Sequence, residues 1–97
     1  MVAFMSTRPK FSPGQVVATP GAMDALAASG QTPQGFLRRH VAGDWGDVSA
    51  ADAQVNDESL SGGGRLMSSY CTSSGTKIWL ITEADRSVTT LLLPEEY

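Results

Sequence analysis

The sequence predicts an α+β domain in which three short helices precede a three-stranded antiparallel meander. Closely spaced helix start and stop signals fill the middle of the chain, and the chain after Gly64 changes to short runs rich in β-branched and aromatic residues. Helices that come before a meander gather on one face of its sheet, which is the α+β arrangement.

The N-terminal end differs from the rest of the chain in its residue types. Residues 1–13 are expected to form a flexible tail, because STRPKFSPG holds two prolines and a glycine. Residues 14–97 are expected to form a single domain, as usual for a chain of 97 residues. The stretch GQVVAT at 14–19 predicts a short strand at the edge of a sheet, or a continuation of the tail.

Two segments, TPGAMDALAASG and TPQGFLRRHVAG, share one set of helix signals. Thr-Pro suits an N-cap followed by the first helical turn, and the closing Gly suits a left-handed residue. They predict helices over 20–29 and 33–42. The residues expected to face the core are Met23, Leu26 and Ala27 in the first helix, and Phe36, Leu37 and His40 or Val41 in the second.

A third helix is predicted over 50–60. Ser49 with Asp52 three residues later resembles a capping box, and Asp52 suits the positive end of the helix dipole. Ala51, Val55 and Leu60 are expected to face inward. SGGG at 61–64 ends the helix.

Three strand-like runs follow, RLMSSYCT, TKIWLITE and SVTTLLLP, joined by loops of hairpin length. The middle run is apolar on both sides, because Ile78 and Leu80 alternate with Trp79 and Ile81. The helices cover one side. The other side needs cover from the N-terminal segment, from another part of the chain, from a second copy, or from a partner.

Composition excludes some classes of function. The net charge is −3, and seven Lys and Arg give little phosphate-binding capacity, which disfavours direct nucleic-acid binding. The single cysteine, Cys71, allows no internal disulfide and fits a reducing cytoplasm. No apolar run is long enough to span a membrane.

Three patterns with chemical potential have simpler explanations. His40, Asp44 and Asp47 have a spacing that could suit a metal, but Gly43 is expected to end the helix between them. Cys71 with His40 could form a nucleophile and base, although a lone cysteine is more often a buried small hydrophobe. SGGG lacks the Lys-Ser/Thr ending of a phosphate loop. No catalytic, cofactor-binding or metal-binding residue is therefore assigned.

The blocks FSPGQVVATPGAMDAL, RHVAGDWGD, GTKIWLITEADRS and TTLLLPEEY resemble a family of small bacterial proteins found on plasmids and other mobile elements. The resemblance brings no established activity and no catalytic residues. It implies a setting in which small proteins block host defence or regulate maintenance of the element.

The order of helices and strands is also similar to that of RelE-type ribosome-dependent ribonuclease toxins. That similarity would place Arg65, Tyr70 and Arg86 in a catalytic site. Those toxins are basic, whereas this chain is acidic and lacks a basic cluster on the predicted sheet.

We hypothesise a non-enzymatic cytoplasmic module that binds a protein partner, with a ribonuclease or other small hydrolase as the alternative. Its acidic loops could occupy the basic nucleic-acid channel of a restriction or CRISPR complex. Loops on rigid hairpins commonly carry binding residues, whereas a solvated turn is the simpler role for the tip at 83–86. The residues assigned to partner binding are Trp79 and Ile81 on the sheet, and Asp44, Trp45, Asp47, Glu83, Asp85 and Arg86 in the loops.

Overall fold

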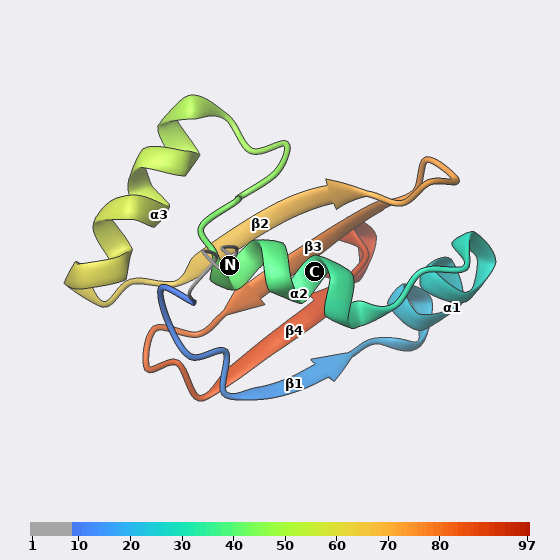
Figure 1. Cartoon of the computed structure of the whole chain (residues 1–97), viewed down its shortest axis with the longest axis horizontal. Coiled ribbons are helices and arrows are strands. Elements are labelled where there is room, and N and C mark those ends of the chain that lie inside the picture. The colour runs from blue at the N-terminus through green and yellow to red at the C-terminus, as the bar shows by residue number, and fades with distance from the viewer. Residues whose placement is uncertain (1–8) are drawn as a thin grey trace, which may run out of the picture.

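The computed structural model describes residues 9–97 as a sheet with two helices on one face and a third helix beside it (Figure 1). The elements in chain order are β1 (Gln15–Ala18), α1 (Pro20–Ser29), α2 (Pro33–Val41), α3 (Ala50–Gly62), β2 (Leu66–Cys71), β3 (Lys77–Thr82), β4 (Val88–Leu92) and the 3₁₀ turn η2 (Pro94–Glu96). The α+β class is confirmed. In the described part of the chain, no helix has the length and apolar character needed to cross a membrane.

The predicted starts of α1 and α2 are confirmed, but the two helices are not capped alike. The Thr19 hydroxyl accepts a hydrogen bond from the amide of Ala22 at 3.1 Å, and Gly30 closes α1 with φ 69°. Thr32 makes no such bond, and α2 ends on Ala42 in a right-handed conformation. Identical signals at the ends of two segments therefore produced different local contacts.

The sheet differs from the predicted three-stranded meander. It has four strands in the order β1-β4-β3-β2, because β1 pairs in parallel with β4 while the other two pairs are antiparallel. Gln15 and Thr19 donate backbone hydrogen bonds to the carbonyls of Ser87 and Leu91, both at 3.0 Å. Gly14, with φ 65°, allows this approach, since a Cβ there would collide with the carbonyl of Ser87.

Residues 1–8 of the expected tail lie outside the described residues. Residues 9–13 run along α2, where the amide of Lys10 donates to the carbonyl of Val41 at 2.6 Å. The carbonyl of Pro13 accepts a hydrogen bond from the Thr89 hydroxyl at 2.7 Å. This segment thereby joins α2 to the sheet before β1 begins.

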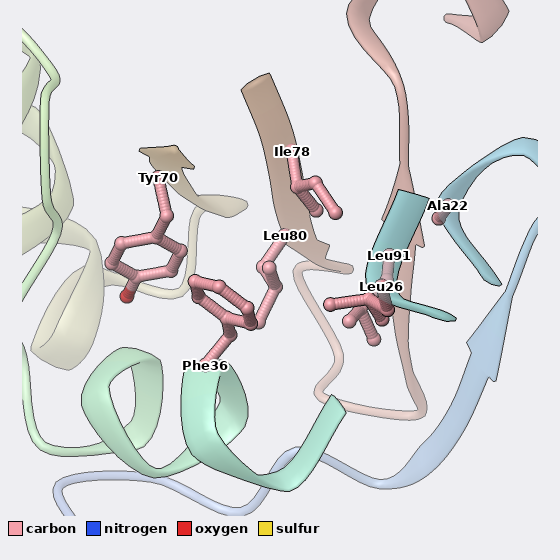
Figure 2. Packing of buried hydrophobic residues seen from close by; sticks show 7 residues of the cluster. All are labelled: Ala22, Leu26, Phe36, Tyr70, Ile78, Leu80 and Leu91. Atoms are coloured by element: carbon pink, nitrogen blue, oxygen red, sulfur yellow. The ribbon is translucent and has the colours of Figure 1, made fainter. Parts of the chain in front are cut away.

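The core lies between the sheet and the pair α1 and α2. Figure 2 shows its buried side chains, which are Ala22, Leu26, Phe36, Tyr70, Ile78, Leu80 and Leu91. Of the predicted core residues, Leu26 of α1 and Phe36 and His40 of α2 are buried. Met23 and Ala27 are exposed instead of buried, because α1 turns Ala22 and Leu26, spaced i and i+4, toward the sheet.

The N-cap of α3 is confirmed, since the Ser49 hydroxyl accepts from the amide of Asp52 at 3.1 Å. Its predicted inward face is wrong: Val55 is 55% exposed, whereas Asn56 is buried. The apolar residues of α3 form no stripe, so the helix lies beside the sheet rather than on it (Figure 1).

Asn56 closes the outer edge of β2. Its side-chain amide donates to the carbonyl of Met67 at 2.8 Å, and its side-chain oxygen accepts from the amide of Met67 at 3.1 Å. The side chain thus replaces a neighbouring strand at this position, and it anchors α3 to the sheet with two hydrogen bonds.

We expect Asn56→Asp to lower the free energy of unfolding by about 2 kcal/mol at neutral pH. The variant keeps the size of the side chain but places a carboxylate oxygen against the Met67 carbonyl, which loses its donor. Gln54→Glu makes the same chemical change at an exposed position of α3 and should cost under about 0.5 kcal/mol. Urea denaturation measures both, and equal losses would contradict the role given to Asn56.

Candidate partner-binding site

Trp79 and Ile81 lie on the outer face of the sheet, which is the face opposite α1 and α2. In the register of β2 and β3, Ile81 pairs with Met67, and these side chains alternate with the core residues of the same strands. Ile81 is only 4% exposed and Trp79 is half-buried. Part of Trp79 is therefore exposed on this face, whereas Ile81 is almost fully covered.

The C-terminal end of the chain covers this face. The ring of Tyr97 meets that of Trp79 edge-on, with centroids 5.8 Å apart, and its hydroxyl accepts from Arg65 at 3.1 Å. The carboxylate of Glu96 accepts from the Thr19 hydroxyl at 2.5 Å and from the amide of Leu93 at 2.8 Å. These hydrogen bonds lower the pKa of Glu96. Residues 93–97 thus cover the part of the outer face around Trp79.

Trp45 is buried in the loop before α3 and attaches this loop to β2. Its carbonyl accepts from the amide of Ser69 at 3.0 Å, and the amide of Asp47 donates to the carbonyl of Ser69 at 2.6 Å. The loop therefore extends the sheet beyond β2. The indole N–H donates to Asp57 at 3.0 Å, and the ring lies buried beside Phe11.

Asp44 lies at the start of the same loop and forms an ion pair with Arg39, at 2.7 Å. The hydrogen bond from Arg39 lowers the pKa of this carboxyl. Arg39 also lies over the ring of Tyr70, 4.4 Å from its centroid, and the Tyr70 hydroxyl donates to the backbone carbonyl of Asp44 at 2.5 Å. The charge of Asp44 is therefore partly neutralised, whereas Asp47 has no ion pair among the described residues.

The turn between β3 and β4 uses Arg86 as a structural residue. Its backbone has φ 62°, a conformation that non-glycine residues rarely adopt. Its guanidinium donates to the carbonyls of Ser59 and Gly64, both at 2.7 Å, and to those of Glu83 and Ala84, both at 3.1 Å. The side chain thus binds the C-terminal end of α3 to the turn, and these hydrogen bonds offset the backbone strain.

The acidic residues of the turn take different roles. The carboxylate of Glu83 pairs with Arg65 at 3.5 Å. Asp85 accepts from the amide of Ser87 at 2.9 Å and is exposed. Both side chains of the Glu83–Arg65 ion pair are exposed, so the pair adds little to the stability of the fold.

The structure gathers most of the carboxylates at one end of the molecule. We define the acidic end as α3 with the loop before it and the turn between β3 and β4, which lie together in Figure 1. It holds seven of the ten acidic residues of the chain: Asp44, Asp47, Asp52, Asp57, Glu58, Glu83 and Asp85. Five of them fall between 44 and 62, a stretch without lysine or arginine.

A shallow groove of about 200 Å³ lies between α3 and β2. Val48, Val55 and Met67 give it apolar walls, and Asp52 and Arg65 line it as well. Sequence reasoning missed this groove because it placed Val55 in the core. The available signal was the weak apolar pattern of α3, which is typical of a helix that does not pack by an apolar face.

His40 takes no part in a metal or nucleophilic site with Asp44 or Cys71. Its ring is buried, with Nδ1 at 2.5 Å from the Ser68 hydroxyl and Nε2 at 2.8 Å from the Thr82 hydroxyl. Cys71 is exposed at the end of β2, contrary to the buried position expected for it. Within residues 9–97, no three His, Cys, Asp or Glu side chains are grouped to hold a metal ion.

The hydrogen bonds around His40 define its tautomer. The carbonyl of Pro13 can only accept, so the single hydroxyl hydrogen of Thr89 is donated to it. The Thr82 hydroxyl, 2.6 Å from that of Thr89, must therefore be the donor between the two threonines. The Thr82 oxygen then accepts from Nε2–H of His40, and neutral Nδ1 accepts from Ser68. A serine that donates to a histidine resembles the start of a nucleophilic site, but Ser68, His40 and Thr82 are all sealed in the core.

Of the three residues suggested by the similarity to ribonuclease toxins, Arg65 and Arg86 both contact Glu83, but Tyr70 lies apart from them. Tyr70 is buried on the helix-covered face, and burial raises its pKa to about 12. Arg65 binds Tyr97 at the outer face, and Arg86 is committed to backbone carbonyls in the turn. No shared site for a substrate follows from these positions.

We expect Arg86→Ala to lower the free energy of unfolding by about 3 kcal/mol, because it leaves several carbonyls without their donor. Amide hydrogen exchange should rise most in the last turn of α3. Arg38→Ala is the matched control, since Arg38 is exposed and should cost under about 0.5 kcal/mol. Similar losses in the two variants would refute the structural role of Arg86.

We expect the stability of the protein to fall as the pH drops from about 6.5 to about 4. Burial lowers the pKa of His40 from 6.5 to about 4, so in this window the unfolded chain binds a proton that the folded chain does not. Stability is fully present above pH 6.5, and about 3 kcal/mol of it is lost by pH 4. Denaturant titrations at several pH values measure this loss.

His40→Gln supplies the comparison, because its amide can donate and accept but does not titrate. The difference in unfolding free energy between the two proteins removes the shared contribution of the carboxylates. That difference should change across the window from pH 6.5 to 4. A difference that stays constant with pH would show that His40 does not titrate as stated.

Comparisons with protein families, with curated proteins and with solved structures gave no match to this chain.

Proposed function

We propose that the protein is a non-enzymatic binding module that presents its acidic end to a basic surface of a partner protein. The observation that carries the proposal is the concentration of seven carboxylates on α3, on the loop before it and on the turn between β3 and β4. Fields from clustered like charges steer an oppositely charged partner and favour its binding at low salt.

The carboxylates of the acidic end are unequally available. Asp44 and Glu83 pair with arginines, and Asp57 accepts from Trp45. Asp52 and Glu58 are exposed on α3, and neither forms an ion pair with a residue in the described part of the chain. These two side chains are the ones that we assign to the partner.

The groove beside α3 supplies the apolar part of the contact. Binding sites commonly combine an apolar centre with a polar rim, and one or two buried anchors carry most of the energy. Val55 and Met67 line this groove, with Asp52 at the same site. A partner that inserts one apolar side chain here would bring its basic residues near the carboxylates of α3.

Basic channels that hold nucleic acid are a suitable class of partner, because they are built to bind clustered negative charge. The resemblance to proteins of plasmids and mobile elements favours a host defence complex of the restriction or CRISPR type, in the cytoplasm of a bacterium. In that setting the protein would act by competing with nucleic acid.

The test uses a purified CRISPR or restriction complex and measures its DNA binding by gel shift at low salt. We expect the protein to weaken DNA binding, and the double variant Asp52→Asn, Glu58→Gln to lose about tenfold of this effect. Asp24→Asn, Glu95→Gln removes the same two charges elsewhere on the surface and should act as the unchanged protein does.

Two results would count against the proposal. If the protein leaves DNA binding unchanged at low salt, competition at a basic channel fails. If both double variants lose the effect equally, the net charge of the chain acts rather than the acidic end.

A further inference from the structure

The two edges of the sheet differ in whether their outward backbone groups have hydrogen-bond partners. The outer edge of β2 is closed by the side chain of Asn56 and by the loop around Trp45. The other edge belongs to β1, and no described segment pairs with its outer side. Open edges offer unpaired backbone groups to another chain, so natural proteins usually block them.

The unpaired groups of β1 can be assigned to residues. Gln15 and Thr19 direct their amides toward β4, where they bond to Ser87 and Leu91. Because backbone groups alternate in direction along a strand, Val16 and Ala18 direct theirs toward the open edge. An added strand would therefore bond to Val16 and Ala18 without disturbing the pairing of β1 with β4.

The side chains of β1 suit such a contact. Val16 and Val17 are both 39% exposed and lie on opposite faces of the strand. The strand QVVA has no charged residue, although Lys or another charge is a common protection of open edges. Two β-branched residues on an uncharged edge favour strand pairing.

We propose that the β1 edge pairs antiparallel with β1 of a second copy of the chain, which joins the two sheets into one. A two-fold axis through Val17 places Val16 of each copy opposite Ala18 of the other, where both exchange their outward backbone hydrogen bonds. Val17 then meets its own counterpart on the outer face of the joined sheet. This register pairs all the outward groups of the strand.

A second copy fits this edge for reasons of charge and length. A two-fold axis places the same strand opposite itself. Because the strand is uncharged, this arrangement brings no like charges together. Pro13 and Pro20 limit the ladder to the residues between them, so the pairing ends with one added strand. The contact is small, below about 1,200 Å², which predicts a weak dimer that forms only at high protein concentration.

The test is sedimentation of the full chain over about 10 µM to about 1 mM, where we expect the mass to rise toward that of a dimer. Val16→Pro removes an outward amide and leaves the bonds to β4 in place, so it should remain monomeric with an unchanged melting temperature. Val17→Lys places two like charges at the axis and should also remain monomeric. Val16→Thr keeps the amide and the β-branched shape, and should dimerise as the unchanged chain does.

A chain that stays monomeric at about 1 mM overturns the proposal, and so do Val16→Pro and Val17→Lys if they dimerise normally. If circular dichroism shows that Val16→Pro is destabilised, Val17→Lys decides alone. Because β1 and α3 lie at opposite edges of the sheet, this outcome is independent of the binding role of the acidic end.

Discussion

The buried, neutral imidazole of His40 fixes the register of the strands, and the rest of the structure depends on that register. His40 of α2 is hydrogen-bonded to Ser68 of β2 and Thr82 of β3, and the chain of hydroxyls continues through Thr89 of β4 to the carbonyl of Pro13. A slip of one residue in any of these strands would move its hydroxyl to the outer face. His40 or a neighbour would then be buried without a partner, so the polar chain selects one register.

The protein is stabilised in two different ways. The layer of α1, α2 and the sheet buries a contiguous apolar core, whereas α3 is attached mainly through Asn56, Asp57 and the contact of Arg86 with its last turn. Few buried apolar contacts imply that α3 opens at a lower free energy than the core. A binding surface on such a helix can adjust to a partner while the sheet keeps its register.

The sequence predicts what depends on neighbours in the chain, and it fails for contacts that join distant residues. The Thr-Pro signals of α1 and α2, the Ser49 cap and the three hairpin strands are local features, and all are found. The parallel pairing of β1 depends on Ser87 and Leu91, which are about seventy positions away. Likewise, nothing near Arg86 in the sequence indicates that its guanidinium binds the end of α3.

Prediction of the candidate site from the sequence fails for the same reason. Ile81 was assigned to partner binding from the alternation of a strand, yet it is buried, and burial was inferred for Val55 from a helical spacing, yet Val55 is exposed. In both cases the pattern describes a single element, whereas the position of its neighbours decides which side chains are covered. Tyr97 meets Trp79 where Arg65 binds its hydroxyl, and the preceding residue, Glu96, is hydrogen-bonded to Thr19 at the start of α1. A carboxylate at position 96 therefore helps to hold the segment that covers Trp79, a contact between residues far apart in the sequence.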